Sequence, residues 1–116
     1  MRPIYPILAV PAVTSIVGTK IYQDQANQDT QAPFVVWMRQ AVVPENNLSQ
    51  RPPGDRLSLA VDVFARTEQE RDNLLTATRD AIESVGHVLT IQSLGQEPDT
   101  GYWRSTFDAD LFDHRL

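Results

Sequence analysis

The segment DADLFDH, residues 108–114, gathers the side chains in this sequence that are best suited to chemistry. Alternation along a strand would place Asp108 and Asp110 on one face, where they could hold Mg²⁺ or Ca²⁺ together with Asp113. The EF-hand spacing is not met, because no glycine follows at the sixth position and no glutamate closes the loop. We therefore interpret these acids as outward residues of a terminal strand, with Arg104 as a same-face partner, and we predict no metal or cofactor.

No other pattern of reactive residues is complete. Cysteine is absent, and His87 and His114 do not have a zinc-binding spacing. No G-x-S-x-G elbow occurs, and the segment VGTK lacks the other glycine of a phosphate-binding loop. Asp62 could act as a buried base, but we predict an exposed acid on the open face of a sheet. The sequence predicts that the protein is not an enzyme.

Length and composition indicate a single domain, residues 1–116, with the composition of an ordinary soluble globular protein. The net charge of −5 comes from 15 acidic and 10 basic residues. A nucleic-acid binder should show a basic excess, so tight DNA binding is not expected, although DNA could still pass by the protein. Trp37, Tyr102 and Trp103 could stack on bases, but without adjacent positive charge we favour core packing or a subunit contact.

The start of the chain combines a basic residue with an apolar stretch, MRPIYPILAVPAVTSIVG. A signal peptide is one reading of it. We prefer a short core segment, because prolines interrupt the stretch and no small-x-small cleavage site follows. Pro11 is expected to open a short helix that Gly18 closes. No apolar run reaches the ~18 residues of a membrane-spanning helix.

The clearest local pattern is a strand followed by a helix. Leu57, Leu59, Val61 and Val63 alternate with more polar residues, which predicts a strand with one core face. A helix over 67–85 is predicted next, from an apolar stripe at helical spacing. Thr67 and Glu70 fit a capping box at its start, and Gly86 is expected to end it.

The remaining segments read as strands and loops. The polar tract Gln23–Ala32 is predicted to be an exposed loop, and a strand with two apolar faces should start at Phe34. Pro44 should stop this strand, with a second loop over residues 44–55 that contains a rigid Pro-Pro-Gly turn. A final hairpin should pair Val88–Leu94 with Tyr102–Phe112.

The predicted fold class is therefore α+β. We expect a mostly antiparallel sheet of about four or more strands, with the long helix 67–85 and a short N-terminal helix packed on one side.

Two segments of the sequence resemble a known family. They are VGTKIYQDQANQDTQAPFVVWMRQ, residues 17–40, and LSLAVDVFARTEQERDNLLTATRDAI, residues 57–82. A glycine, an Ile-Tyr hook, a polar loop, and a proline before an apolar strand are followed by a V-D-V-F-A strand and a capped helix. In this order they resemble the tail-completion or tail-terminator (head–tail joining) proteins of long-tailed bacteriophages, over about residues 17–112. The matching positions are Gly18, Ile21, Tyr22, Pro33, Val61, Asp62, Val63 and the helix Thr67–Val85.

The resemblance implies a virion structural protein. Such proteins form rings, commonly six-fold, at the head-proximal end of the tail, where they stop growth of the tail tube and join the tail to the head connector. The implied partners are further copies of the chain, the tail tube protein and the connector proteins, with DNA only in passage. The implied location is the virion, after synthesis in the bacterial host cytoplasm.

We predict that the subunit or ring interface uses both polar loops and the mixed aromatic-basic strand face of Val35, Trp37 and Arg39, because aromatic residues and arginine are favoured at interface centres. The predicted interface residues are Gln25, Asn27, Gln28, Asp29, Trp37, Arg39, Asn47 and Arg51. The alternatives are another minor tail or neck protein of the same fold, and a small non-catalytic binding module.

Overall fold

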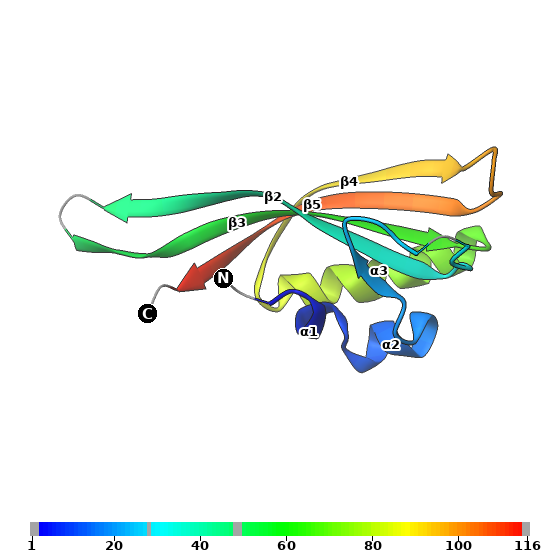
Figure 1. Ribbon diagram of the computed structural model, residues 1–116, viewed down its shortest axis with the longest axis horizontal. Coiled ribbons are helices and arrows are strands. Elements are labelled where there is room, and N and C mark those ends of the chain that lie inside the picture. The colour runs from blue at the N-terminus through cyan, green and yellow to red at the C-terminus, as the bar shows by residue number, and fades with distance from the viewer. Residues whose placement is uncertain (1–2, 28, 48–49, 115–116) are drawn as a thin grey trace.

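One five-stranded sheet organises the fold, and the helices pack on one of its faces (Figure 1). The computed structural model describes residues 3–27, 29–47 and 50–114. Its elements are, in chain order, α1 (Tyr5–Leu8), α2 (Pro11–Val17), β1 (Ile21–Gln23), β2 (Phe34–Asn47), β3 (Gln50–Ala65), α3 (Glu68–Glu83), β4 (Gly86–Gln96) and β5 (Trp103–His114).

The strand order is β1-β2-β3-β5-β4, with β3 in the centre. The short strand β1 runs parallel to β2, and every other neighbouring pair is antiparallel. Val61 lies opposite Trp37 on β2 and opposite Phe107 on β5. This arrangement confirms the predicted α+β class and the mostly antiparallel sheet.

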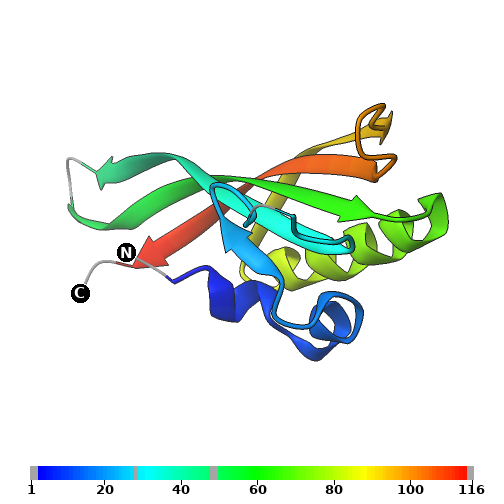
Figure 2. The same ribbon diagram turned by 45° about the vertical axis from the view of Figure 1, so that its right-hand side comes forward.

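The main core lies between the sheet and the helices, as the turned view in Figure 2 shows. The predicted inward row of β3 is confirmed: each of its members is at most 1% exposed. The members are Leu57, Leu59, Val61 and Val63. Leu74 and Ile82 of α3 are buried in the same core, and the hydroxyl of Thr78 donates to the carbonyl of Leu74 at 2.9 Å. That bond satisfies the Thr78 hydroxyl, which is fully buried.

The N-terminal segment confirms the predicted short helix and adds one more. Pro11 occupies the first turn of α2, and Gly18 follows the helix with a φ of 64°. The additional turn α1 precedes it. Leu8 and Val13 are buried with the helix-facing residues of the sheet, so the apolar start of the chain is part of the core.

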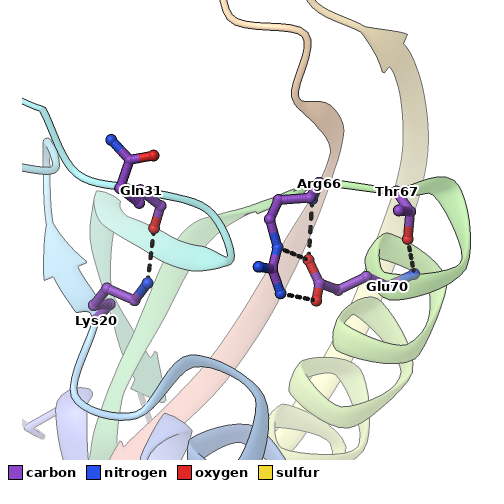
Figure 3. A network of polar contacts seen from close by, with 5 residues as sticks. All are labelled: Lys20, Gln31, Arg66, Thr67 and Glu70. Atoms are coloured by element: carbon purple, nitrogen blue, oxygen red, sulfur yellow. Dashed lines mark hydrogen bonds and ion pairs between the residues drawn. The ribbon is translucent and has the colours of Figure 1, made fainter.

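The predicted Thr67 cap of α3 is confirmed, whereas the Glu70 contact and the end of the helix differ from the prediction. Thr67 caps the helix, since its Oγ1 accepts from the backbone amide of Glu70 at 3.1 Å. The Glu70 carboxylate, however, accepts from the backbone amide of Arg66 at 3.0 Å, one residue before the position that a capping box requires (Figure 3). At the other end the helix stops at Glu83, and Gly86 does not cap it but begins β4.

Gly86 is needed for close strand pairing. A Cβ at this position would lie 2.3 Å from the carbonyl oxygen of Asp110 and 2.4 Å from a methyl group of Leu111. Only a residue without a side chain allows the two backbones to approach this closely. The glycine that we expected to act at the helix end therefore acts at the first contact between β4 and β5.

The predicted loop over residues 44–55 is wrong, because both of its halves are strand. β2 continues through Pro44, which lies opposite Asp55 of β3. Proline lacks an amide proton and is tolerated where a strand has only one neighbour. β1 pairs only with residues 35–37, and the pairing of β3 with β5 reaches no further than Gly54. The prolines therefore lie at edge positions of a hairpin, which extends past the helices in Figure 1.

We expect Gly86→Ala to lower the free energy of unfolding by about 1–3 kcal/mol, because the new methyl group would meet backbone that cannot move aside cheaply. Urea unfolding followed by circular dichroism measures this. Gln92→Ala, at an exposed position of the same strand, is the control and should change the value by at most about 0.5 kcal/mol. Equal stabilities of Gly86→Ala and the wild type would contradict the close approach.

Candidate assembly surfaces

The polar tract before β2 is a loop that is folded onto the sheet. Ala26 and Ala32 pack with Phe34 and Val36 in a second apolar cluster, on the sheet face opposite the helices. The expectation of an exposed loop holds for Gln25, since its side chain is open to solvent. The loop does not stand free of the sheet, because its apolar residues cover part of a strand face.

Polar contacts hold the end of this loop. The Lys20 ammonium donates to the carbonyl oxygen of Gln31 at 2.8 Å (Figure 3). The hydroxyl of Tyr102 lies 3.5 Å from the Gln31 side-chain oxygen. The backbone amide of Asp24 donates to the carbonyl oxygen of Trp37 at 2.8 Å, which ties the start of the loop to β2. The loop can therefore present its exposed side chains in a defined place.

The predicted interface residues of this loop divide into two groups. Asn27 and Asp29 are exposed, as Gln25 is. Asp29 adopts a left-handed backbone with a φ of 65°. Gln28 lies outside the described residues.

The aromatic-basic face of β2 is covered, contrary to expectation. Val35 and Trp37 are in the main core, and Trp37 is only 5% exposed. The guanidinium carbon of Arg39 lies 5.3 Å from the centre of the Trp37 ring, a distance typical of a cation–π contact. α1 and α2 supply Leu8 and Val13 to the same core, so a single long helix does not have to cover this face alone. Val35 and Trp37 are buried, whereas Arg39 is half-buried and keeps part of its side chain in contact with solvent.

Asn47 and Arg51 lie in the β2–β3 hairpin, far from the polar loop. Their backbones belong to the last residue of β2 and the second residue of β3. β2 has 14 residues, and a strand rises about 3.3 Å per residue, so its two ends lie far apart in a molecule 52 Å long. Figure 1 shows the two ends of β2 far apart along the long axis of the molecule. The predicted residues therefore form two separate surfaces.

The acidic residues of β5 are the candidate metal ligands. Among the described residues, no group of three or more His, Asp or Glu side chains is arranged to hold a metal ion. Asp110 lies 3.9 Å from the guanidinium group of Arg56 on β3. The predicted third ligand, Asp113, has a described backbone in β5, opposite Asp55.

Asp62 is buried instead of exposed. It is 9% exposed, and its carboxylate accepts from a guanidinium nitrogen of Arg104 at 2.8 Å. The guanidinium carbon of Arg104 also lies 5.3 Å from the centre of the Phe64 ring. Both residues lie on the sheet face opposite the helices. Arg104 therefore pairs with Asp62 of β3, whereas Asp110 of β5 lies near Arg56.

A polar depression of about 450 Å³ lies between α2 and the first turn of α3. Its lining residues are Ser15, Ile16, Arg66, Thr67, Gln69, Glu70 and Asn73. Arg66 donates to the Glu70 carboxylate through Nε and a terminal nitrogen, at 3.3 and 3.0 Å (Figure 3). The hydrogen bonds from Arg66 lower the pKa of Glu70, because they favour its charged form. The carboxylate is thus held ionised by its neighbour, which makes it a structural group.

An exposed apolar edge was not predicted from the sequence. Leu89, Ile91 and Leu94 of β4 are among the most exposed large apolar side chains of the described chain. The sequence signal was present, because no Asp, Glu, Lys or Arg occurs between Gly86 and Gln96.

No helix in the described part of the chain is long and apolar enough to cross a membrane.

Comparison with known proteins gives a match over nearly the whole fold. The family model described as "Tail completion protein gp17" matches residues 5–114. Among solved structures, a chain of the virion of a native gene transfer agent (GTA) particle is similar in fold, with a TM-score of 0.69 at 14% sequence identity. The similarity covers 97% of this chain and 92% of that chain. No curated protein matches the chain in sequence.

We expect Asp62→Ala to lower the free energy of unfolding by about 2 kcal/mol, because it removes the nearer charged partner of the half-buried Arg104 guanidinium and leaves only Glu97, at 4.0 Å. Thermal or urea unfolding measures the loss. Asp108→Ala, which removes a half-buried acid from the same sheet face, is the matched control and should cost less. If the two variants are equally stable, Asp62 does not have the structural role that we assign to it.

The Arg66–Glu70 pair predicts a specific pH dependence. Because folding lowers the pKa of Glu70, its contribution to stability is present above the ordinary glutamate pKa and is lost as the pH falls through the folded value. The difference in unfolding free energy between the wild type and Glu70→Gln should therefore shrink from pH 7 toward pH 3. Asp99→Asn, in the turn between β4 and β5, serves as the control for removal of an exposed acid. If the stability difference between the wild type and Glu70→Gln grows as the pH falls, the pKa of Glu70 is not lowered by folding.

Proposed function

Because the chain belongs to the tail completion protein gp17 family, and so to a family of structural proteins of the phage tail, we propose that it forms a ring at the head-proximal end of the tail. There it ends growth of the tail tube and joins the tail to the head connector. The observation that carries this proposal is the match of the family model over residues 5–114, which includes every helix and strand of the described chain.

The separation of the two candidate surfaces supports a protein with two kinds of contact. We assign the loop with Gln25, Asn27 and Asp29 to the contact between neighbouring subunits. Arg39 of β2, which is half-buried, is assigned to the same contact. The hairpin that carries Asn47 and Arg51 projects past the helices, and we assign it to the tail tube or the connector. A ring component needs both contacts, since it must bind its own copies sideways and other proteins along the axis.

The charge of the chain fits a ring through which DNA passes. The net charge is −5, and among the described residues Asp62 and Asp110 each have an arginine near them on the open sheet face. Such a surface offers phosphate groups no uncompensated positive patch to hold them. We propose six subunits per ring, a location in the virion after synthesis in the host cytoplasm, and DNA as a passing molecule only.

The alternatives are another minor tail or neck protein of the same fold, and a small non-catalytic binding module. The state of assembly separates them. A module of the last kind would remain a monomer or dimer, whereas a tail completion ring must contain several copies.

We expect the purified protein to form closed rings of about six copies, either alone or on tail tubes, seen by light scattering and negative-stain microscopy. Added to growing tubes, it should stop elongation at one end. A double variant, Gln25→Lys with Asp29→Lys, should weaken ring formation while circular dichroism stays unchanged, and Asp99→Lys should not. Point variants are preferable to deletion of the loop, because deletion would uncover Phe34 and Val36.

The proposal fails if the chain stays a single copy both alone and with tail tubes. It also fails if tubes continue to grow at both ends when the protein is in excess.

A further inference from the structure

The outer edge of β4 has bulges but no other protection that is usual for an edge strand. β4 is the last strand in the sheet order, so one side of its backbone has no partner in the described chain. Soluble proteins protect such edges with charges, prolines, bulges or a covering segment. β4 has bulges at two places, but it contains no Asp, Glu, Lys, Arg or Pro in its 11 residues. An edge of this kind is a template for another strand.

Apolar side chains accompany this edge. Leu89 is 59% exposed, Leu94 is 48% exposed and Ile91 is 37% exposed. Single exposed apolar residues are ordinary, whereas here three lie along one uncharged strand, and we call them the apolar strip of β4. The bulges do not bury these side chains, so water meets the strip directly in the single copy.

The opposite side of the sheet has a second open edge. β1 covers only three residues of β2, from Val35 to Trp37. From Met38 onward the outer side of β2 has no partner strand within the described residues. Ala41 and Val42 are exposed there, and Val42 is 38% exposed. Pro44 cannot donate a hydrogen bond, so the stretch best able to pair is Met38–Val43.

We propose that the β4 edge of one copy pairs with the Met38–Val43 edge of β2 of the next copy, so that the sheets join from subunit to subunit. This inference rests on the proposed function, since it adds an edge-to-edge contact between neighbouring copies to the loop contact assigned above. The two edges are different and belong to opposite ends of the strand order. A contact between unlike edges is head-to-tail, and head-to-tail contacts make rings when the rotation closes.

A second copy of the chain fits these edges better than other occupants. The only ionisable side chain in β4 is that of His87, so the edge offers nothing to a highly charged partner such as DNA. A symmetric β4–β4 pair would satisfy one edge but would leave the β2 edge open and would end at a dimer. Pairing of β4 with β2 satisfies both edges of every copy with a single kind of contact, whereas symmetric pairing would need a second, β2–β2 contact as well.

Two variants test the apolar strip. Leu89→Lys and Ile91→Lys should each reduce assembly at least tenfold, measured as the concentration at which the light-scattering mass falls to that of one copy. Circular dichroism of the single copy should stay unchanged and its melting temperature should change little, because Leu89 is 59% exposed and Ile91 is 37% exposed in it. Tyr5→Lys is the matched control, since Tyr5 is 41% exposed on α1, away from both edges.

A cross-linking experiment tests which edges meet. The chain has no cysteine, so introduced cysteines report only their own positions. Val42→Cys and Leu89→Cys are made as separate proteins of different tag length, and a second pair uses Ala41→Cys and Ile91→Cys. After mild oxidation of a mixture, we expect disulfides between the two proteins, because paired strands bring Cα atoms to within about 7 Å. Each protein oxidised alone should give few or none.

The outcomes separate this inference from the proposed function. Rings that form equally well with Leu89→Lys and Ile91→Lys, without mixed disulfides, overturn the edge contact and leave the ring standing. A disulfide of Leu89→Cys with itself shows a symmetric β4–β4 contact and also overturns it. Mixed disulfides in open filaments, without closed rings, support the edge contact and contradict the ring. A chain that never associates, alone or on tubes, overturns both.

Discussion

Burial of one row of β3 beneath the helices is the constraint on which the rest of the sheet depends. Leu57, Leu59, Val61 and Val63 point into the main core, and a shift of one residue would turn all of them to the opposite face. β3 is paired on both sides, so its register fixes β2 and β5 directly and β4 through β5. The same register places the alternate residues of β3, among them Asp62 with its partner Arg104, on the face opposite the helices. Positions of the loop, the hairpin and the open edges all follow from this one choice.

The parts of the fold that could be predicted are those in which the pattern is local. Alternation identified β3, and helical spacing with the Thr67 cap identified α3, because burial of one face leaves its period in the sequence. Pro44 misled the prediction, since its tolerance depends on β2 being an outer strand there, which only the strand order shows. Gly86 was predicted to end the helix but begins β4 instead. Its need for a small residue comes from the Asp110 carbonyl on another strand, and sequence neighbours give no sign of that contact.

Exposure at the candidate surfaces could be predicted where it depends on the local sequence, and it could not be predicted where it depends on distant elements. The polar loop was correctly predicted to expose residues such as Gln25, because a polar run without a period rarely finds a core. Trp37 was expected on an open face, but the face it occupies is filled by α1 and α2, whose packing site does not follow from their own sequences. The β4 edge was missed because alternation assigns the faces of a strand and says nothing about its neighbours. Exposure of Leu89 depends on β4 being last in the sheet.

The absence of charge from β4 also agrees with the electrostatics of self-assembly. Each copy carries a net charge of −5, so copies of the chain repel one another at long range. Physiological salt screens this repulsion beyond about 8 Å, but acids brought directly against acids at a joint would still oppose each other. A strand with no acid in it avoids that cost, and backbone hydrogen bonds and burial of Leu89 and Ile91 can then act without opposition. The acidic charge of the chain is thereby placed away from the edge at which the copies would meet.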